Sequence, residues 1–321
     1  MKRKRWMNLK AIAFNEYGSA DKLSLMDLPV PEIGAHQVLV QSKATSINPI
    51  DWKLREGYLK QMFDWQFPIV VGWDIAGIIT EVGADVTDWH VGDEVFARPD
   101  TTRQGTYAEF VAVDDHLLAH KPENVSFAEA AAVPLAGLTA WQGLFEHGEL
   151  QQGQRVLIQA GAGGVGTYAI QLAKHAGAEV WTTASPKNDA LLHDLGADVV
   201  VDYHDAAAMA QISNMDLVLD TIGGQSAVDA IGYLKTGGKQ ISITGTVPEG
   251  VRLAQEEGKH YQSIWLRPDG QQLAYLATLM AEGALRSVIA EQLPFSLASL
   301  VEAHHLSETG HTNGKIVITF D

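Results

Sequence analysis

Three glycines, Gly161, Gly163 and Gly166, have the spacing of a turn that binds phosphates. They follow an apolar run at 155–160 with the character of a buried strand, and they open a stretch whose apolar residues share one helical face. In such a turn the first glycine permits the bend, the second lets backbone approach a pyrophosphate, and the third lets the helix pack on the strand. The start of the helix then offers free N–H groups to the phosphates. The sequence therefore predicts a dinucleotide site at this turn, and the alternative is a glycine-rich loop without a ligand.

The residues after the next expected strand indicate which dinucleotide is bound. An NAD site usually places a carboxylate about 20 residues after the glycines, where it holds the ribose hydroxyls. Here Ser185 and Lys187 follow the strand, and no carboxylate appears before Asp189. A hydroxyl and an ammonium suit a 2′-phosphate, so NADP(H) is favoured, with a merely solvated Lys187 as the alternative. Tyr203, at the end of the following strand, either donates to that phosphate, covers the adenine or only packs.

The elements that must position these residues alternate between strand and helix from residue 126 onward. Ser126 and Glu129 have the spacing of a capping box at the start of a helix. Alternation at this pace predicts βαβ units and a parallel sheet. The expected strands are 155–160, 179–184, 198–203, 216–221 and 239–245, and the expected helices are 166–176, 188–195 and 225–235.

The flanking regions have a different texture. Expected strands at 9–14, 37–44, 75–82 and 107–113 are separated by Gly, Pro and Asp clusters, which is typical of antiparallel β structure. After residue 268 we expect one amphipathic helix over 268–282 and then short strands, including 315–320. The prediction is an α/β protein in which a doubly wound parallel-sheet domain at 129–268 is inserted into a β-rich domain formed by 1–128 and 269–321.

Composition excludes several classes of function. The net charge of −16 argues against a nucleic-acid-binding protein, which normally presents a basic face. No run approaches the roughly 20 apolar residues of a membrane span, so we expect no membrane partner and a cytoplasmic location. The chain has no cysteine, which removes disulfides and Cys-ligated zinc. The basic run at residues 2–5 is interpreted as a tail or as residues upstream of a start at Met7, and residues 1–6 carry no predicted role.

Several ordered blocks of the chain resemble the medium-chain dehydrogenase/reductase superfamily, in its zinc-free quinone oxidoreductase (zeta-crystallin-like) group. The resemblance covers nearly the whole chain and is far more specific than the glycine turn alone. Its blocks are SINPIDWKLREG (46–57), FPIVVGWDIAGIITEVGADVTDWHVGDEV (67–95), GTYAEF (105–110), AAAVPLAGLTAWQGL (130–144), AGAGGVG (160–166) and GHTNGKIVITF (310–320).

The resemblance implies a Rossmann domain inserted into a GroES-like domain, with NADP(H) between them, and a homodimer that pairs the edge strands of two Rossmann sheets. It also implies roles for residues at matching positions. Asn48 lies near the nicotinamide and substrate, Thr139 lies beside the nicotinamide ribose or carboxamide, and Gly245 lies on a loop that passes the nicotinamide. The pyrophosphate is held by Ala162, Gly163, Gly164, Val165 and Gly166, and the 2′-phosphate is surrounded by Ser185, Lys187 and Tyr203.

Two departures from the family pattern bear on the chemistry. Zinc-dependent relatives carry Gly-His-Glu where this chain has Gly72-Trp73-Asp74, so the histidine ligand is replaced and we predict no metal. Lys53 stands where many quinone reductases of the group have tyrosine, whereas alkenal- and enone-reducing relatives often have a basic residue there. The acceptor is therefore expected to be a quinone or an enone, with the choice left open.

We accordingly expect NADPH-dependent hydride transfer to a quinone or α,β-unsaturated carbonyl. Asn48 and Thr139 would mainly position the nicotinamide ring. Lys53 would donate a hydrogen bond or proton, unless it is only a solvated lysine. Trp52, Trp73 and Trp265 either line an aromatic pocket or pack in cores. The alternative function is a non-catalytic NADP(H)-binding sensor or structural protein.

Overall fold

The two ends of the chain and its middle fold into different units in the computed structural model, which describes residues 8–320. The first unit comprises the described residues up to Leu135 together with Pro268–Gly283 and the residues from Ser287 onward. The second unit comprises Ala136–Arg267 and Ala284–Arg286. The basic run at residues 2–5 lies outside the described residues.

The first unit is built on two β-sheets. The smaller sheet has the order β2-β1-β4, and the larger has the order β15-β16-β3-β5-β6-β8, with β7 also paired to β3. All pairings are antiparallel except β15 with β16. The strands are β1 (Leu9–Phe14), β2 (Ser24–Leu28), β3 (Gln37–Ile47), β4 (Ile69–Val70), β5 (Ile75–Val82), β6 (Glu94–Ala97), β7 (Phe110–Asp114), β8 (Leu118–His120), β15 (Ile289–Pro294) and β16 (Lys315–Thr319).

Helices pack against these sheets. In α2 the predicted capping box is confirmed, because the Ser126 hydroxyl accepts from the Glu129 N–H and the Glu129 carboxylate accepts from the Ser126 N–H. Helix α2 lies against β3, β5 and β16, so it belongs to the β-rich unit. The helices of this unit are α1 (Pro49–Arg55), α2 (Phe127–Ala132), α9 (Gly270–Ala281) and α10 (Leu297–Glu308), with 3-10 turns η1 (Ala20–Lys22) and η2 (Asp115–Leu117).

The second unit contains one parallel sheet, as the alternating pattern predicts. Its strand order β11-β10-β9-β12-β13-β14 corresponds to 3-2-1-4-5-6 in chain order, the order of a dinucleotide-binding Rossmann sheet. The order reverses between β9 and β12, and a crevice forms at such a switch point beyond the carboxyl ends of the strands. The strands are β9 (Arg155–Ile158), β10 (Glu179–Ala184), β11 (Val199–Asp202), β12 (Met215–Asp220), β13 (Leu234–Ser242) and β14 (His260–Ser263).

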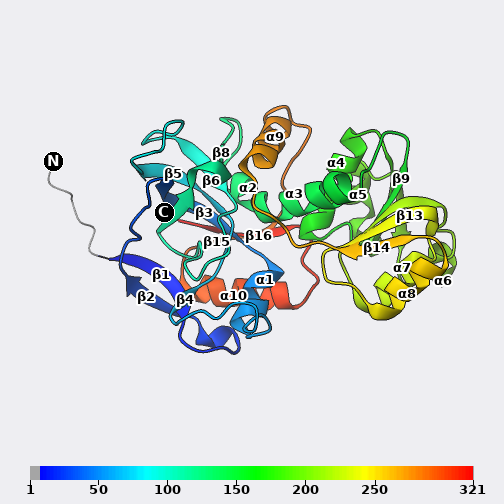
Figure 1. Cartoon of the computed structure of the whole chain (residues 1–321), viewed down its shortest axis with the longest axis horizontal. Coiled ribbons are helices and arrows are strands. Elements are labelled where there is room, and N and C mark those ends of the chain that lie inside the picture. The colour runs from blue at the N-terminus through cyan, green and yellow to red at the C-terminus, as the bar shows by residue number, and fades with distance from the viewer. Residues whose placement is uncertain (1–7, 321) are drawn as a thin grey trace. The chain divides into compact units, whose positions relative to one another are not determined.

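Helices cover both faces of this sheet (Figure 1). Helix α4 packs against β9 and β10, while α6, α7 and α8 bury apolar side chains together on the opposite face. Helix α3 follows directly on α2. The helices are α3 (Pro134–Trp141), α4 (Gly164–His175), α5 (Asp189–Asp194), α6 (Ala206–Met209), α7 (Gly224–Ile231) and α8 (Pro248–Glu256), with the π-helical segment η3 (Gln142–His147) and the 3-10 turn η4 (Pro186–Asn188).

Some expected elements differ from the structure. The helix expected over 225–235 ends at Ile231, and β13 already begins at Leu234, because its first part reaches across to pair with Met215. Helices α1 and α8 lie in stretches where the sequence predicted no helix. The short strands expected after residue 282 are joined by helix α10. Among residues 8–320, no helix is long and apolar enough to span a membrane.

Candidate active site

The glycine turn follows β9 at the carboxyl edge of the parallel sheet. A Cβ on Gly166 would lie 2.6 Å from the Ala160 carbonyl oxygen and 2.7 Å from the Gly161 Cα, so only glycine permits this approach of helix to turn. A Cβ on Gly161 would collide with the Thr182 hydroxyl on the neighbouring strand. The close packing of helix on strand that the spacing predicts for the third glycine is therefore present at Gly166.

The same turn leaves the start of α4 free to bind an anion. Gly163 is the N-cap residue, with no side chain to bond the first N–H groups of the helix. Gly163, Gly164 and Val165 are half-buried, whereas Ala162 and Gly166 are buried. The helix dipole and the N–H groups thus meet at a partly exposed point, which is the arrangement that binds phosphates.

The residues expected around a 2′-phosphate also gather at this edge. Strands β10 and β11 pair in register, with Ala184 opposite Asp202, so the next residues of each strand are neighbours. The hydroxyls of Ser185 and Tyr203 lie 3.2 Å apart. Lys187 is exposed in the turn η4, two residues after Ser185. The structure thus brings together two hydroxyls and supplies a nearby ammonium.

The other two residues of this unit that the resemblance assigns to the cofactor lie in a loop and in a helix. Gly245 is exposed in the loop after β13 and has a φ of 103°, which favours glycine. Thr139 is buried in α3.

The sequence analysis missed two residues at the carboxyl edge of the parallel sheet. Gln159 after β9 and Asp220 at the end of β12 each bury one side-chain oxygen without a hydrogen-bond partner. Their signal is a polar residue at the end of an apolar strand.

Asn48, in the first unit, is the N-cap of α1 and is held by three residues. Its Nδ2 donates to the Asp74 carboxylate at 2.7 Å, and its Oδ1 accepts from the Lys315 ammonium at 2.5 Å. Its backbone N–H donates to Asp51, three residues along, at 2.8 Å. Asp74 also accepts from Ser46 at 2.5 Å and from the Leu135 N–H at 2.7 Å. The side chain that the resemblance assigns to the nicotinamide and substrate is therefore rigidly oriented.

Asp51 is wholly buried and lies at one end of a hydrogen-bonded chain. It accepts from the Tyr107 hydroxyl at 2.7 Å, and that hydroxyl lies 3.3 Å from His304 Nε2. His304 Nδ1 faces an Arg55 nitrogen at 2.9 Å, and because arginine only donates, Nδ1 must accept and Nε2 carries the proton. Arg55 in turn pairs with Glu308 at 2.7 Å. The chain fixes Asp51 but does not relay protons through Arg55, which holds its own.

Burial dominates the electrostatics of this cluster. It raises the pKa of Asp51 to about 7, against stabilising bonds from Asn48 and Tyr107. Burial lowers the pKa of His304 to about 3, and the positive charge of Arg55 lowers it further. Burial also lowers the pKa of Lys315, whereas the carboxylates of Asp74 and Asp51 act to raise it. Arg98 lies opposite Asp74, because the neighbouring residues Ala97 and Ile75 pair across β6 and β5. Arg98 is buried, and this burial lowers its pKa to about 10.

The other predicted residues of the first unit occupy varied surroundings. Lys53 in α1 is half-buried, and its ammonium lies 5.6 Å from the centre of the Trp52 ring. Trp73 is wholly buried in a hydrophobic core, so it packs in that core and lines no open pocket. Trp265, in the second unit, is exposed. Among residues 8–320, no group of three or more His, Asp or Glu residues is placed to hold a metal ion.

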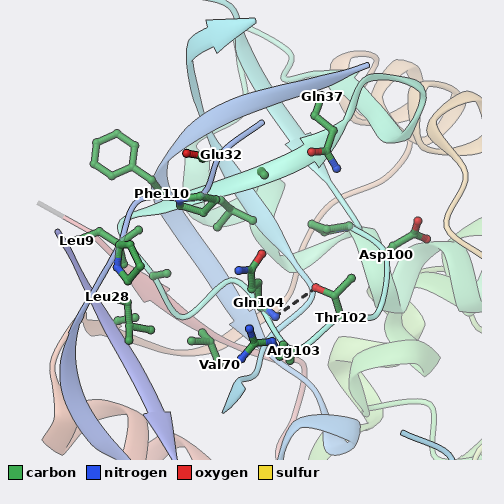
Figure 2. A pocket seen from close by; sticks show the side chains of 18 of the residues that line it. Leu9, Leu28, Glu32, Gln37, Val70, Asp100, Thr102, Arg103, Gln104 and Phe110 are labelled. Atoms are coloured by element: carbon green, nitrogen blue, oxygen red, sulfur yellow. Dashed lines mark hydrogen bonds between the residues drawn. The ribbon is translucent and has the colours of Figure 1, made fainter. Parts of the chain in front are cut away.

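A separate cavity of about 350 Å³ lies in the first unit (Figure 2). Figure 2 shows Val70 near the polar residues Arg103 and Gln104, while Phe110 lies near Glu32. The Gln104 N–H donates to the Thr102 hydroxyl at 3.2 Å. None of the predicted site residues lines it. It is therefore not the site that the sequence predicts.

Comparison with known proteins gives matches over nearly the full chain. The family model "Alcohol dehydrogenase GroES-like domain" matches residues 34–123, and "Zinc-binding dehydrogenase" matches residues 195–318. A 2-methylene-furan-3-one reductase of Solanum lycopersicum is 38% identical over 97% of this chain and 79% of its own length. An NADPH-dependent alkenal/one oxidoreductase of Arabidopsis thaliana is 36% identical over the same shares. The solved structure of a quinone oxidoreductase from Coxiella burnetii is 37% identical, with a TM-score of 0.90 over 97% of this chain and 99% of that chain.

Proposed function

Because this chain belongs to the quinone oxidoreductase (zeta-crystallin-like) group of the medium-chain dehydrogenase/reductase superfamily, we propose that it reduces a quinone or an α,β-unsaturated carbonyl with NADPH and without zinc. The observation that carries the proposal is the carboxyl edge of the parallel sheet. The glycine cradle, the bare start of α4 and the Ser185–Tyr203 hydroxyl pair all lie there, at the ends of adjacent strands. The names of the relatives supply the chemical class of the acceptor.

The residues present fit NADP(H). Gly163, the second glycine of the turn, has no side chain between its backbone and an approaching pyrophosphate, which Ala162, Gly163, Gly164, Val165 and Gly166 would hold. Ser185, Lys187 and Tyr203 would hold the 2′-phosphate, while Thr139 and Gly245 would border the nicotinamide. When bound, NADPH supplies the hydride.

The protein's own contribution is to bind the acceptor and assist the growing negative charge on its oxygen. The acceptor takes up two electrons with a hydride, and its oxygen then takes up a proton. Asn48 would donate to that oxygen, and Lys53 would donate a hydrogen bond or the proton. Thr139 would position the nicotinamide ring. Lys53 fits this role because no other side chain forms an ion pair or hydrogen bond with its ammonium among the described residues.

The zinc-free part of the proposal rests on the ligands the chain carries. It has no cysteine, and Trp73 fills a core at the position where zinc-dependent relatives carry histidine. Without a Lewis acid, an alcohol or simple ketone loses its usual means of stabilising an alkoxide. Quinones and enones are already electron-poor, so they accept hydride with less stabilisation of the negative charge on their oxygen.

The test is NADPH consumption with benzoquinones and enones, measured beside simple ketones. We expect turnover of quinones or enones and little of ketones. Turnover of ketones alone would contradict the proposal, and cofactor binding without any turnover would favour a sensor.

A second arm tests the 2′-phosphate site. Lys187→Ala should weaken NADPH binding roughly tenfold, since a charge-assisted hydrogen bond is lost, and should leave NADH binding unchanged. Lys174→Ala is the matched control, because that lysine pairs with Asp198 at the far end of α4. Equal binding of NADH and NADPH, unchanged in Lys187→Ala, would refute the phosphate argument.

A further inference from the structure

Lys315, which no sequence pattern singled out, is buried beside Asn48 at the start of the last strand. Its side chain is 4% exposed, and its ammonium donates to the Ile47 carbonyl at 2.9 Å and to Asn48 Oδ1. The Asp74 carboxylate lies 3.6 Å from the same ammonium. A buried lysine costs considerable free energy unless its charge is compensated, so this arrangement is a specific one.

The two charges determine which way the Asn48 amide faces. A carbonyl oxygen suits an ammonium, and an N–H suits a carboxylate. Rotating the amide by half a turn would set Nδ2 against Lys315 and Oδ1 against Asp74, which are two repulsive contacts. Lys315 and Asp74 together therefore hold the amide in one orientation.

This orientation leaves Asn48 mainly a donor. One Nδ2 hydrogen is used by Asp74, and the second has no partner among the described residues. The oxygen already accepts from a cation, which weakens it as an acceptor for any further group. The positive charge at the oxygen also polarises the amide and strengthens its remaining N–H as a donor.

We propose that Lys315 is a positioning residue of the reductase site, which fixes Asn48 so that its remaining N–H donates to the carbonyl oxygen of the acceptor. The inference rests on the proposed function and extends it by naming the atom that Asn48 offers. Negative charge grows on that oxygen as hydride arrives, so a donor held in advance lowers the barrier more than one that must reorient. Lys315 touches neither cofactor nor acceptor and acts through Asn48.

The first test is Lys315→Met, which removes the ammonium while keeping a chain of similar length. We expect kcat to fall roughly 10- to 100-fold, the cost typical of a misplaced reacting group, with NADPH affinity unchanged. We also expect the isotope effect on kcat to rise when NADPH carries deuterium at the transferred position, because hydride transfer becomes rate-limiting. A loss of folded protein would lower the apparent kcat without changing the isotope effect.

Ser42→Ala is the matched control for general destabilisation. Ser42 lies on β3, the strand that precedes Asn48, and its buried hydroxyl donates to the Ala108 carbonyl at 2.6 Å. This variant should lose stability but keep its kcat and its isotope effect. A folded Lys315→Met protein with the kcat and isotope effect of the unmodified enzyme would overturn the proposal.

A second measurement needs no turnover. With asparagine-selective ¹⁵N labelling, the Asn48 amide proton that is bonded to Asp74 should exchange slowly with solvent in the unmodified protein and quickly in Lys315→Met. If Lys315→Met does not fold, the double variant Lys315→Met/Asp74→Asn, which removes both charges, takes its place. We expect the same fast exchange in the double variant. Rapid exchange of both Asn48 amide protons in the unmodified protein would itself contradict the inference. If the protein reduces no quinone or enone, the proposed function fails, while this measurement still decides whether Lys315 orients Asn48.

Discussion

Asp51 is the residue whose charge should respond most to pH. Burial raises its pKa to about 7 in the folded protein, from 3.8 in the unfolded chain. Between these values the folded protein holds a proton that the unfolded chain has lost, so stability falls as the pH rises. Below about pH 4, Asp51 makes its full contribution to the free energy of unfolding. Between about pH 4 and pH 7, this contribution falls by roughly 1 kcal/mol per pH unit.

Asp51→Asn should remove this dependence. Its amide oxygen can still accept from Tyr107 and the Asn48 N–H, and it cannot ionise. We expect the free energy of unfolding in urea to decline less between pH 5 and pH 7 for the variant than for the unmodified protein. Parallel curves for the two proteins would show that the Asp51 carboxyl does not titrate in this range.

The site divides into residues that sequence can and cannot predict. Ser185 and Tyr203 were predictable because each directly follows a strand, and the ends of adjacent parallel strands must be neighbours. Lys315 and Asn48 are 267 positions apart, and their contact depends on β16 pairing with β3. Neither residue's local pattern specifies that pairing, so the orientation of Asn48 emerges only from the fold.

At the scale of elements, we expect the packing of α4 on the glycine turn to affect both stability and cofactor binding. In Gly166→Ala, the new Cβ meets only backbone atoms of Ala160 and Gly161, which cannot move aside without shifting the helix. We expect a loss of roughly 1–3 kcal/mol in the free energy of unfolding, the usual cost of overpacking, together with weaker NADPH binding. Urea unfolding and fluorescence titration with NADPH measure the two effects.

Gly232→Ala is the control for that variant. Gly232 is exposed at the end of α7 with a helical φ of −63°, and a Cβ there meets only the Asp229 carbonyl oxygen at 3.2 Å. Its stability should change little or rise by roughly 0.4–1 kcal/mol, because the unfolded chain loses freedom. Equal effects of the two alanines would indicate that the close packing at Gly166 is unimportant.

The elements that sequence predicts well have a clear period and clear ends. Strands β1, β5 and β10 match their expected bounds, because each is an apolar or β-branched run between turn residues. Helix α10 was missed, since its apolar residues do not gather on one face. Its burial against the first unit's core, through Leu300 and Ala303, is a tertiary effect.

At the scale of the whole molecule, we propose a homodimer that pairs the free edges of two parallel sheets. Strand β14 ends the six-stranded sheet and pairs on one side only, with β13. The Ile264 N–H bonds the Ser242 carbonyl of that strand. Because N–H groups alternate sides along a strand, the N–H of Gln262 also faces β13, and the N–H groups of Tyr261 and Ser263 face outward.

This alternation allows the dimer to be tested without disturbing the fold. Ser263→Pro removes an outward N–H and adds a ring at the edge, so it should shift the protein from dimer to monomer with little loss of stability. Gln262→Pro removes an inward N–H and should instead destabilise the sheet itself. Sedimentation velocity and urea unfolding distinguish the two effects. A protein that is monomeric without substitution, or a Ser263→Pro variant that remains a folded dimer, would show that β14 does not form the interface.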